Sequence, residues 1–191
     1  MIGEPPADGI KLHIGGWEQR EGWKILDAIP GPIVDYVGNC TELTFLDDES
    51  CCEVYASHVF EHLGYNGELQ TALKGVYRVL KPGGKVLAVT RARYDVDFWF
   101  RTVFFWYGWL GATRREAADV NSRRYSGRGL RRLFHRFIEH RIHKRQLRRS
   151  EVPHVWRVLP LPVLARLMGR VLVMKAFKPV SIAISSPALA A

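Results

Sequence analysis

The 191-residue sequence predicts an α/β fold with a mainly parallel, twisted sheet. Short apolar runs alternate with turn residues through residues 10–90, and one amphipathic helix separates the last two runs. Strands that alternate with crossover segments form parallel sheets whose two faces are covered. Apolar residues make up 47% of the chain, which is typical of a globular protein. The length suits a single domain with one core.

Four apolar runs predict four strands in the first sixty residues. They are residues 11–15, 23–27, 33–37 and 53–57. Residues 69–80 predict a helix, because apolar side chains recur at i, i+3, i+4, i+7, i+8 and i+11. The run Pro82-Gly83-Gly84 should end that helix, and residues 85–90 predict a fifth strand.

The second half predicts fewer regular elements. Four apolar residues between 130 and 137 have helical spacing, and residues 171–176 predict a last strand. Charge also separates the halves, because residues 1–90 carry a net charge of −6 and residues 91–191 a net charge of +15. An acidic first half suits a ligand with a cationic centre and no phosphate. The basic half indicates either an anionic partner or a solvated basic face.

Two glycines and a carboxylate follow the first two predicted strands, where ligands bind to parallel sheets. Gly15 and Gly16 let a ligand approach the backbone. Asp27, twelve residues after Gly15, can accept hydrogen bonds from ribose hydroxyls. Residues 17–22 are too few for a crossover helix, so we expect no helix N-terminus there to bind a pyrophosphate. The pattern therefore favours a nucleoside-type ligand other than NAD.

Five motifs, in this order, resemble the predicted S-adenosylmethionine-dependent methyltransferases of the type-11 kind, a class I family. They are LHIGG (12–16), GWKILD (22–27), VGNCTEL (37–43), YASHVFEHL (55–63) and RVLKPGG (78–84). The resemblance resumes loosely at residues 124–134 and at residues 175–179. It implies a Rossmann-like class I methyltransferase sheet with helices on both faces. It also implies an enzyme that uses S-adenosylmethionine as its methyl donor.

The resemblance gives cofactor-binding roles to seven residues. They are Gly15, Gly16, Asp27, Asn39, Cys40, Thr41 and Ser57. The glycines would pass under the methionine part of the cofactor, and the aspartate would hold the ribose. The run from 39 to 41 would border the adenine, and the serine would flank the sulfonium.

Three positions depart from the family pattern. The usual Gly-x-Gly is shortened to Gly15-Gly16, Asn39 stands where the family has Asp, and a carboxylate pair is replaced by Cys51-Cys52. An alternative function is therefore a non-catalytic binding or scaffolding protein on a degenerate methyltransferase fold.

His58, Glu61 and His62 form a polar cluster after the fourth predicted strand. His58 and His62 are candidate general bases for a hydroxyl or amine acceptor. The alternative is a Glu-His pair that caps and packs a helix start. The spacing of the two histidines also suits metal ligands, but the sequence shows no third ligand, so we predict no metal.

Eight aromatic residues lie within residues 98–109. They predict a buried lid or core helix, an interfacial helix on an anionic membrane, or a stacking surface for nucleic acid. We favour the lid. As the acceptor we favour a small molecule or a lipid-linked glycan over nucleic acid.

The expected division of the chain is a single domain, with a cofactor-binding half (10–90), an acceptor-side insertion or lid (91–135), final strands (136–179) and a tail (180–191).

The expected location is the cytoplasm, with peripheral membrane contact as an option. Three cysteines, two of them adjacent, give no disulfide framework and suit free thiols in a reducing compartment. The N-terminus does not have the pattern of a signal peptide. Arginines interrupt the most apolar segments, so we predict no membrane-spanning helix.

Overall fold

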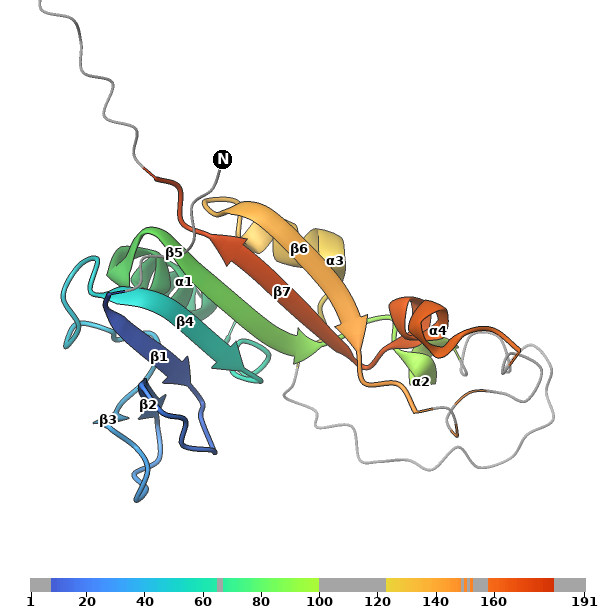
Figure 1. The fold of residues 1–191 in the computed structure, drawn as a ribbon, viewed down its shortest axis with the longest axis horizontal. Coiled ribbons are helices and arrows are strands. Elements are labelled where there is room, and N and C mark those ends of the chain that lie inside the picture. The colour runs from blue at the N-terminus through green and yellow to red at the C-terminus, as the bar shows by residue number, and fades with distance from the viewer. Residues whose placement is uncertain are drawn as a thin grey trace, which may run out of the picture.

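Seven strands form one sheet, in the order β3-β2-β1-β4-β5-β7-β6, in the computed structural model (Figure 1). The structure describes residues 8–64, 67–99, 123–148, 150, 152 and 158–180. The strands are β1 (Ile10–Ile14), β2 (Trp23–Asp27), β3 (Tyr36–Val37), β4 (Cys51–Ser57), β5 (Leu80–Arg91), β6 (Ile138–Arg145) and β7 (Val171–Phe177). The helices are α1 (Glu68–Val79), α2 (Val96–Trp99), α3 (Gly127–Leu133) and α4 (Leu161–Met168). Among the described strands β7 alone runs in the opposite direction to the other six, which confirms the predicted mainly parallel sheet.

The strands before α1 follow the predicted runs, with one clear difference in length. β1 and β2 agree with the predicted bounds to within one residue. β3 has two residues where five were predicted, because the backbone N–H of Val34 donates to the Gly31 carbonyl, 3.1 Å away, and closes a turn. Residues 15–22 contain no helix, which confirms the expected loop between β1 and β2.

One face of the sheet packs against α1 and α3, and both helices lie behind the sheet in Figure 1. The apolar stripe of α1 is buried against the strands, as its periodicity predicts. Its buried residues are Leu69, Ala72, Leu73, Val76 and Val79. Leu130 of α3, with Phe134 and Phe137 after it, extends the same core. This face therefore holds the large hydrophobic core of the domain.

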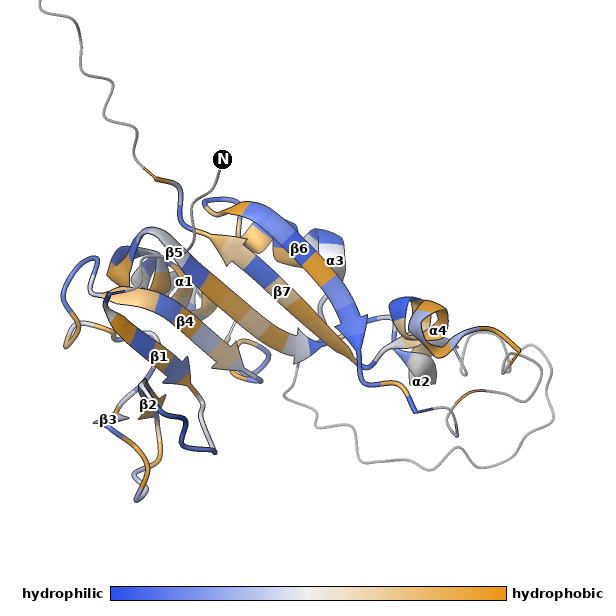
Figure 2. Ribbon diagram, in the orientation of Figure 1, coloured by the Kyte–Doolittle hydropathy of each residue, from blue (hydrophilic) through white to orange (hydrophobic). Residues whose placement is uncertain are grey.

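The opposite face has a different composition. None of the helices in the described ranges lies across it in Figure 1, and α2 and α4 lie near one end of β6. His13 of β1 packs there against Tyr55, with ring centroids 4.5 Å apart. Glu53 of β4 pairs with Lys85 of β5 at 2.6 Å. Figure 2 shows the resulting alternation of hydrophilic and hydrophobic residues along the strands.

The run Pro82-Gly83-Gly84 lies within β5 and does not separate the helix from the strand. α1 ends at Val79 and β5 begins at the next residue, so the predicted strand bound of residue 85 is wrong. The run forms an irregular part of the ladder, where the backbone N–H of Gly83 donates to the Lys178 carbonyl at 3.0 Å. Tertiary contact with Lys178, directly after β7, therefore accompanies the extended strand.

Some predicted features fall outside the described residues. Within residues 98–109 the structure describes only the first two, and it does not describe residues 181–191. In the parts of the chain that are described, no helix is long and apolar enough to cross a membrane.

Candidate functional site

A cavity of about 280 Å³ opens where β1, β2 and β4 end. The carboxyl ends of parallel strands meet at one edge of a sheet, where α/β proteins bind ligands. Its lining residues are Ile14, Gly15, Leu26, Asp27, Ala28, Gly38, Asn39, Cys40, His58, Val59, His62 and Leu63. We call it the cofactor cavity. It brings together six of the nine predicted site residues: Gly15, Asp27, Asn39, Cys40, His58 and His62.

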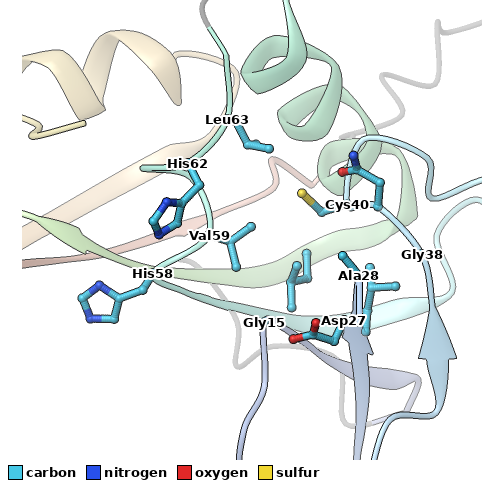
Figure 3. A pocket seen from close by; sticks show the side chains of 12 residues that line it. Gly15, Asp27, Ala28, Gly38, Cys40, His58, Val59, His62 and Leu63 are labelled. Atoms are coloured by element: carbon cyan, nitrogen blue, oxygen red, sulfur yellow. The ribbon is translucent and has the colours of Figure 1, made fainter. Parts of the chain in front are cut away.

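Asp27 is the only carboxylate among the described residues that line the cofactor cavity. Its Oδ1 accepts a hydrogen bond from the backbone N–H of Ile29 at 2.9 Å. Its backbone carbonyl accepts from the N–H of Gly38 at 2.9 Å, which holds the loop after β3 beside β2. In Figure 3 the Asp27 carboxylate lies beside Gly15. The side chain is thus fixed by one oxygen, and Oδ2 has capacity to accept hydrogen bonds from a ligand.

Gly15 and Gly16 have different surroundings. Gly15 has a φ of 70°, in the left-handed region that favours glycine, and lines the cavity. An added Cβ at Gly15 would collide with the Val59 side chain. An added Cβ at Gly16 would instead lie 2.8 Å from the His13 ring, on the face of the sheet without helices. The structure therefore places Gly15 at the cavity and does not place Gly16 among its lining residues.

The loop after β3 supplies one wall of the cavity. Asn39 Oδ1 accepts from the backbone N–H of Thr41 at 3.1 Å and so shapes the loop. Burial raises the pKa of the Cys40 thiol to about 11, so the side chain is neutral at physiological pH. Asn39 and Cys40 line the cavity, whereas Thr41 and Ser57 are not among its lining residues.

His58 lies directly after β4 in a left-handed backbone conformation, with a φ of 57°. Non-glycine residues adopt this conformation uncommonly, and it recurs at functional sites. The backbone N–H of His58 donates to the Val89 carbonyl at 2.9 Å, so β5 holds the residue in place. The His58 ring is 40% exposed, and its Nδ1 lies 3.0 Å from Glu61 Oε1.

Glu61 is a buried carboxylate that joins three parts of the site. Its side chain is 2% exposed. Besides His58, it accepts from the backbone N–H of Arg91 at 2.8 Å, and its Oε1 lies 3.6 Å from Arg91 Nε. Its own carbonyl accepts from the N–H of Arg123 at 2.8 Å. Glu61 therefore fixes the orientation of His58 and connects the loop after β4 to the end of β5.

His62 lines the cavity but is exposed. His58 and His62 lie in a turn and not on a helix, so they do not form the helix start that was the alternative interpretation of this cluster. Figure 3 shows both rings on the same side of the loop, away from Cys40. Among the described residues, no group of three or more His, Cys, Asp and Glu could hold a metal ion.

Several residues at the site were not predicted from the sequence. Val59 and Leu63 form apolar walls of the cavity, and they belong to a motif in which only the polar residues were predicted to have a role. Arg91 was assigned no role, since nothing local in the sequence places it beside Glu61, thirty residues earlier. Its position after an apolar strand was the available signal, because strand ends on parallel sheets gather functional side chains.

Residues 19–88 match the family described as "Methyltransferase domain". This match covers four of the five motifs that carry the predicted resemblance, and it confirms that resemblance. No curated protein matches the chain.

Solved structures with the same fold include two archaeal proteins. A SAM-dependent methyltransferase from Archaeoglobus fulgidus has 14% identity and a TM-score of 0.56, over 90% of this chain and 87% of that one. A SAM-dependent methyltransferase from Methanosarcina mazei has 17% identity and a TM-score of 0.53, over 91% of this chain and 93% of that one. At these identities the likeness concerns the fold, and it confirms the predicted class I methyltransferase sheet.

Proposed function

Since residues 19–88 match the methyltransferase domain family and the sheet has the class I methyltransferase fold, we propose that this chain binds S-adenosylmethionine in the cofactor cavity. The methyl group would pass to an acceptor beside His58. The observation that carries the proposal is Asp27, a lining carboxylate that is fixed through one oxygen at the end of β2. This is where class I folds hold a nucleoside ribose.

The other lining residues fit the same ligand. Ile14, Leu26, Val59 and Leu63 give apolar walls, and Cys40 contributes a neutral thiol. No lysine or arginine lines the cavity among the described residues. A carboxylate with apolar walls suits a ligand that has a cationic sulfonium, a nucleoside and no phosphate.

When bound, S-adenosylmethionine supplies a methyl group that an acceptor lone pair takes in line, while the C–S bonding electrons remain on sulfur. Most of the rate of such a transfer comes from proximity and orientation. The role of His58 is then to remove the proton of the acceptor. With Nδ1–H donated to Glu61, Nε2 has a lone pair that accepts this proton, and the buried carboxylate stabilises the resulting imidazolium.

We assign His62 a weaker role at the rim of the cavity, because it is exposed. The acceptor is a hydroxyl or amine compound, either a small molecule or a lipid-linked glycan. The second candidate function is a non-catalytic scaffold, and it is favoured by the short glycine turn, where the Val59 side chain packs against Gly15.

Calorimetric titration with S-adenosylhomocysteine separates these two functions. We expect the wild type to bind and Asp27→Asn to bind about ten- to a hundredfold more weakly, because a charged hydrogen-bond acceptor is lost. Asp47→Asn, at an exposed carboxylate outside the cavity, is the matched control and should bind like the wild type. Equal binding by wild type and Asp27→Asn would contradict the ribose assignment. Absence of binding by a folded wild type would favour the scaffold.

A further inference from the structure

A second cavity, of about 200 Å³, adjoins the cofactor cavity. Its lining residues are His58, Arg91, Asp95, Arg124, Gln146, Arg170 and Val171. His58 lines both cavities, so a molecule in the second cavity lies next to the base that we assign to the acceptor. We call this second space the arginine cavity.

Three guanidinium groups line the arginine cavity, and two buried acids hold two of them. Arg124 Nη1 lies 2.7 Å from Asp95 Oδ2, and the Asp95 side chain is 7% exposed. Asp95 is itself fixed, because it accepts from the backbone N–H of Phe98 at 3.0 Å. Arg91 is anchored to Glu61, which does not line the cavity. Glu61 and Asp95 thus hold Arg91 and Arg124 in position at the cavity.

Arg91 and Arg124 have donors left for a ligand. A guanidinium carries five N–H donors, and the contacts to Glu61 and Asp95 engage only part of them in Arg91 and Arg124. Their side chains are 44% and 30% exposed, respectively. The third arginine is held through its main chain, since the Arg170 carbonyl accepts from the N–H of Ala92 at 2.8 Å.

Arginines outnumber carboxylates among the described residues that line this space. Arg91, Arg124 and Arg170 line it together with a single carboxylate, Asp95. Planar guanidinium groups pair with carboxylate and phosphate through two parallel hydrogen bonds. A small cavity with several such groups favours an anionic group over a neutral one.

We propose that the arginine cavity binds a carboxylate or phosphate of the acceptor, and so places the atom to be methylated beside His58. This assignment rests on the proposed function, because it names the acceptor class of that same site. In the part of the chain that is described, the cofactor cavity is lined by a carboxylate and no arginine, whereas the arginine cavity is lined by three arginines. The two cavities therefore select opposite charges, cationic for the donor and anionic for the acceptor.

The test is a titration of the isotope-labelled full chain with inorganic phosphate and with acetate, at constant ionic strength, followed by backbone amide NMR. We expect saturable shifts at Ala92, Arg124 and Arg170. Arg91→Gln should weaken anion binding about ten- to a hundredfold. Arg93→Gln is the matched control, because Arg93 lies two residues away and is exposed outside the cavity. The tighter of the two probes identifies a phosphate or a carboxylate acceptor.

Should Arg91→Gln fail to fold, Arg91→Lys keeps the charge but loses the planar fork, and it should weaken binding severalfold. Shifts that sodium chloride reproduces, or equal affinity in the Arg91 and Arg93 variants, would overturn the inference. S-adenosylhomocysteine, titrated into the same samples, separates the two proposals. If S-adenosylhomocysteine binds and the anions do not, the anion-binding role of the arginine cavity alone is overturned. If the anions bind and S-adenosylhomocysteine does not, the proposed function is overturned together with the acceptor assignment.

Discussion

The two faces of the sheet differ in what covers them and in what they contain. The face under α1 and α3 is a continuous apolar core that includes strand residues from β1 to β7. The other face carries His13, the Glu53–Lys85 ion pair and half-buried aromatic rings. Apolar burial dominates folding, while polar groups contribute little unless they are well paired. The stability of the domain should therefore depend mainly on one face.

The largest expected effect is at the core face. Phe134 is 1% exposed and packs on Phe60, with ring centroids 6.0 Å apart. Phe134→Ala should lower the free energy of unfolding by about 3–5 kcal/mol, because it leaves a cavity that the helices cannot fill. Urea denaturation followed by circular dichroism measures this. Tyr55→Leu, on the other face, is the comparison and should cost less than half as much. Similar losses for both would remove the distinction between the faces.

An intermediate effect is expected at His13, whose ring is buried without a hydrogen-bond partner for either nitrogen. Burial lowers the pKa of His13 below its ordinary value of 6.5, with a smaller contribution from the charge of Arg20. The folded state therefore favours the neutral ring. Titration of His13 leaves the free energy of unfolding unchanged above pH 6.5 and lowers it as the pH falls below 6.5.

His13→Leu should raise the free energy of unfolding by about 1 kcal/mol at pH 7, because an unsatisfied buried polar group is removed. The gain should increase between pH 6.5 and pH 5. Burial also lowers the pKa of His143, so the difference between wild type and variant, measured at each pH, isolates His13. A difference that does not change with pH would show that His13 is protonated equally in both states.

The smallest expected effect concerns the ion pair of the face without helices. Glu53 and Lys85 lie 2.6 Å apart, with side chains 16% and 21% exposed. Glu53→Gln should lower the free energy of unfolding by about 0.5–1 kcal/mol, since partly exposed pairs contribute little. The loss should shrink in 1 M salt, where charges are screened. A loss as large as that of Phe134→Ala would mean that this face contributes as much as the core.

The sequence predicted those elements whose residues carry a local pattern. β1, β2 and α1 have compact apolar runs or a clear helical period, and the structure confirms them. β6 was not placed, because its eight residues include Ile138 and Ile142 among charged and histidine side chains. Such a strand forms because β7 pairs with it, which is a tertiary effect.

The candidate site was predicted in part for the same reason. Asp27 and His58 follow recognisable strands, so their positions could be inferred. Gly16, Thr41 and Ser57 were carried over from the family motifs, and they are not among the residues that line the cavity. The contact between Glu61 and Arg91 joins residues thirty positions apart, and no local pattern reports it. The roles assigned to these residues remain predictions.

The position of β7 has a consequence for synthesis of the chain. β7 lies between β5 and β6, although it follows both in sequence. Until the ribosome has produced residues 171–177, β5 ends the sheet with an unpaired edge and β6 has no partner. Unpaired edges attract other strands, and long-range pairing is slow to form. The nascent protein should therefore complete its sheet only after β7 has been synthesised, and until then chaperones should bind its exposed strand edge.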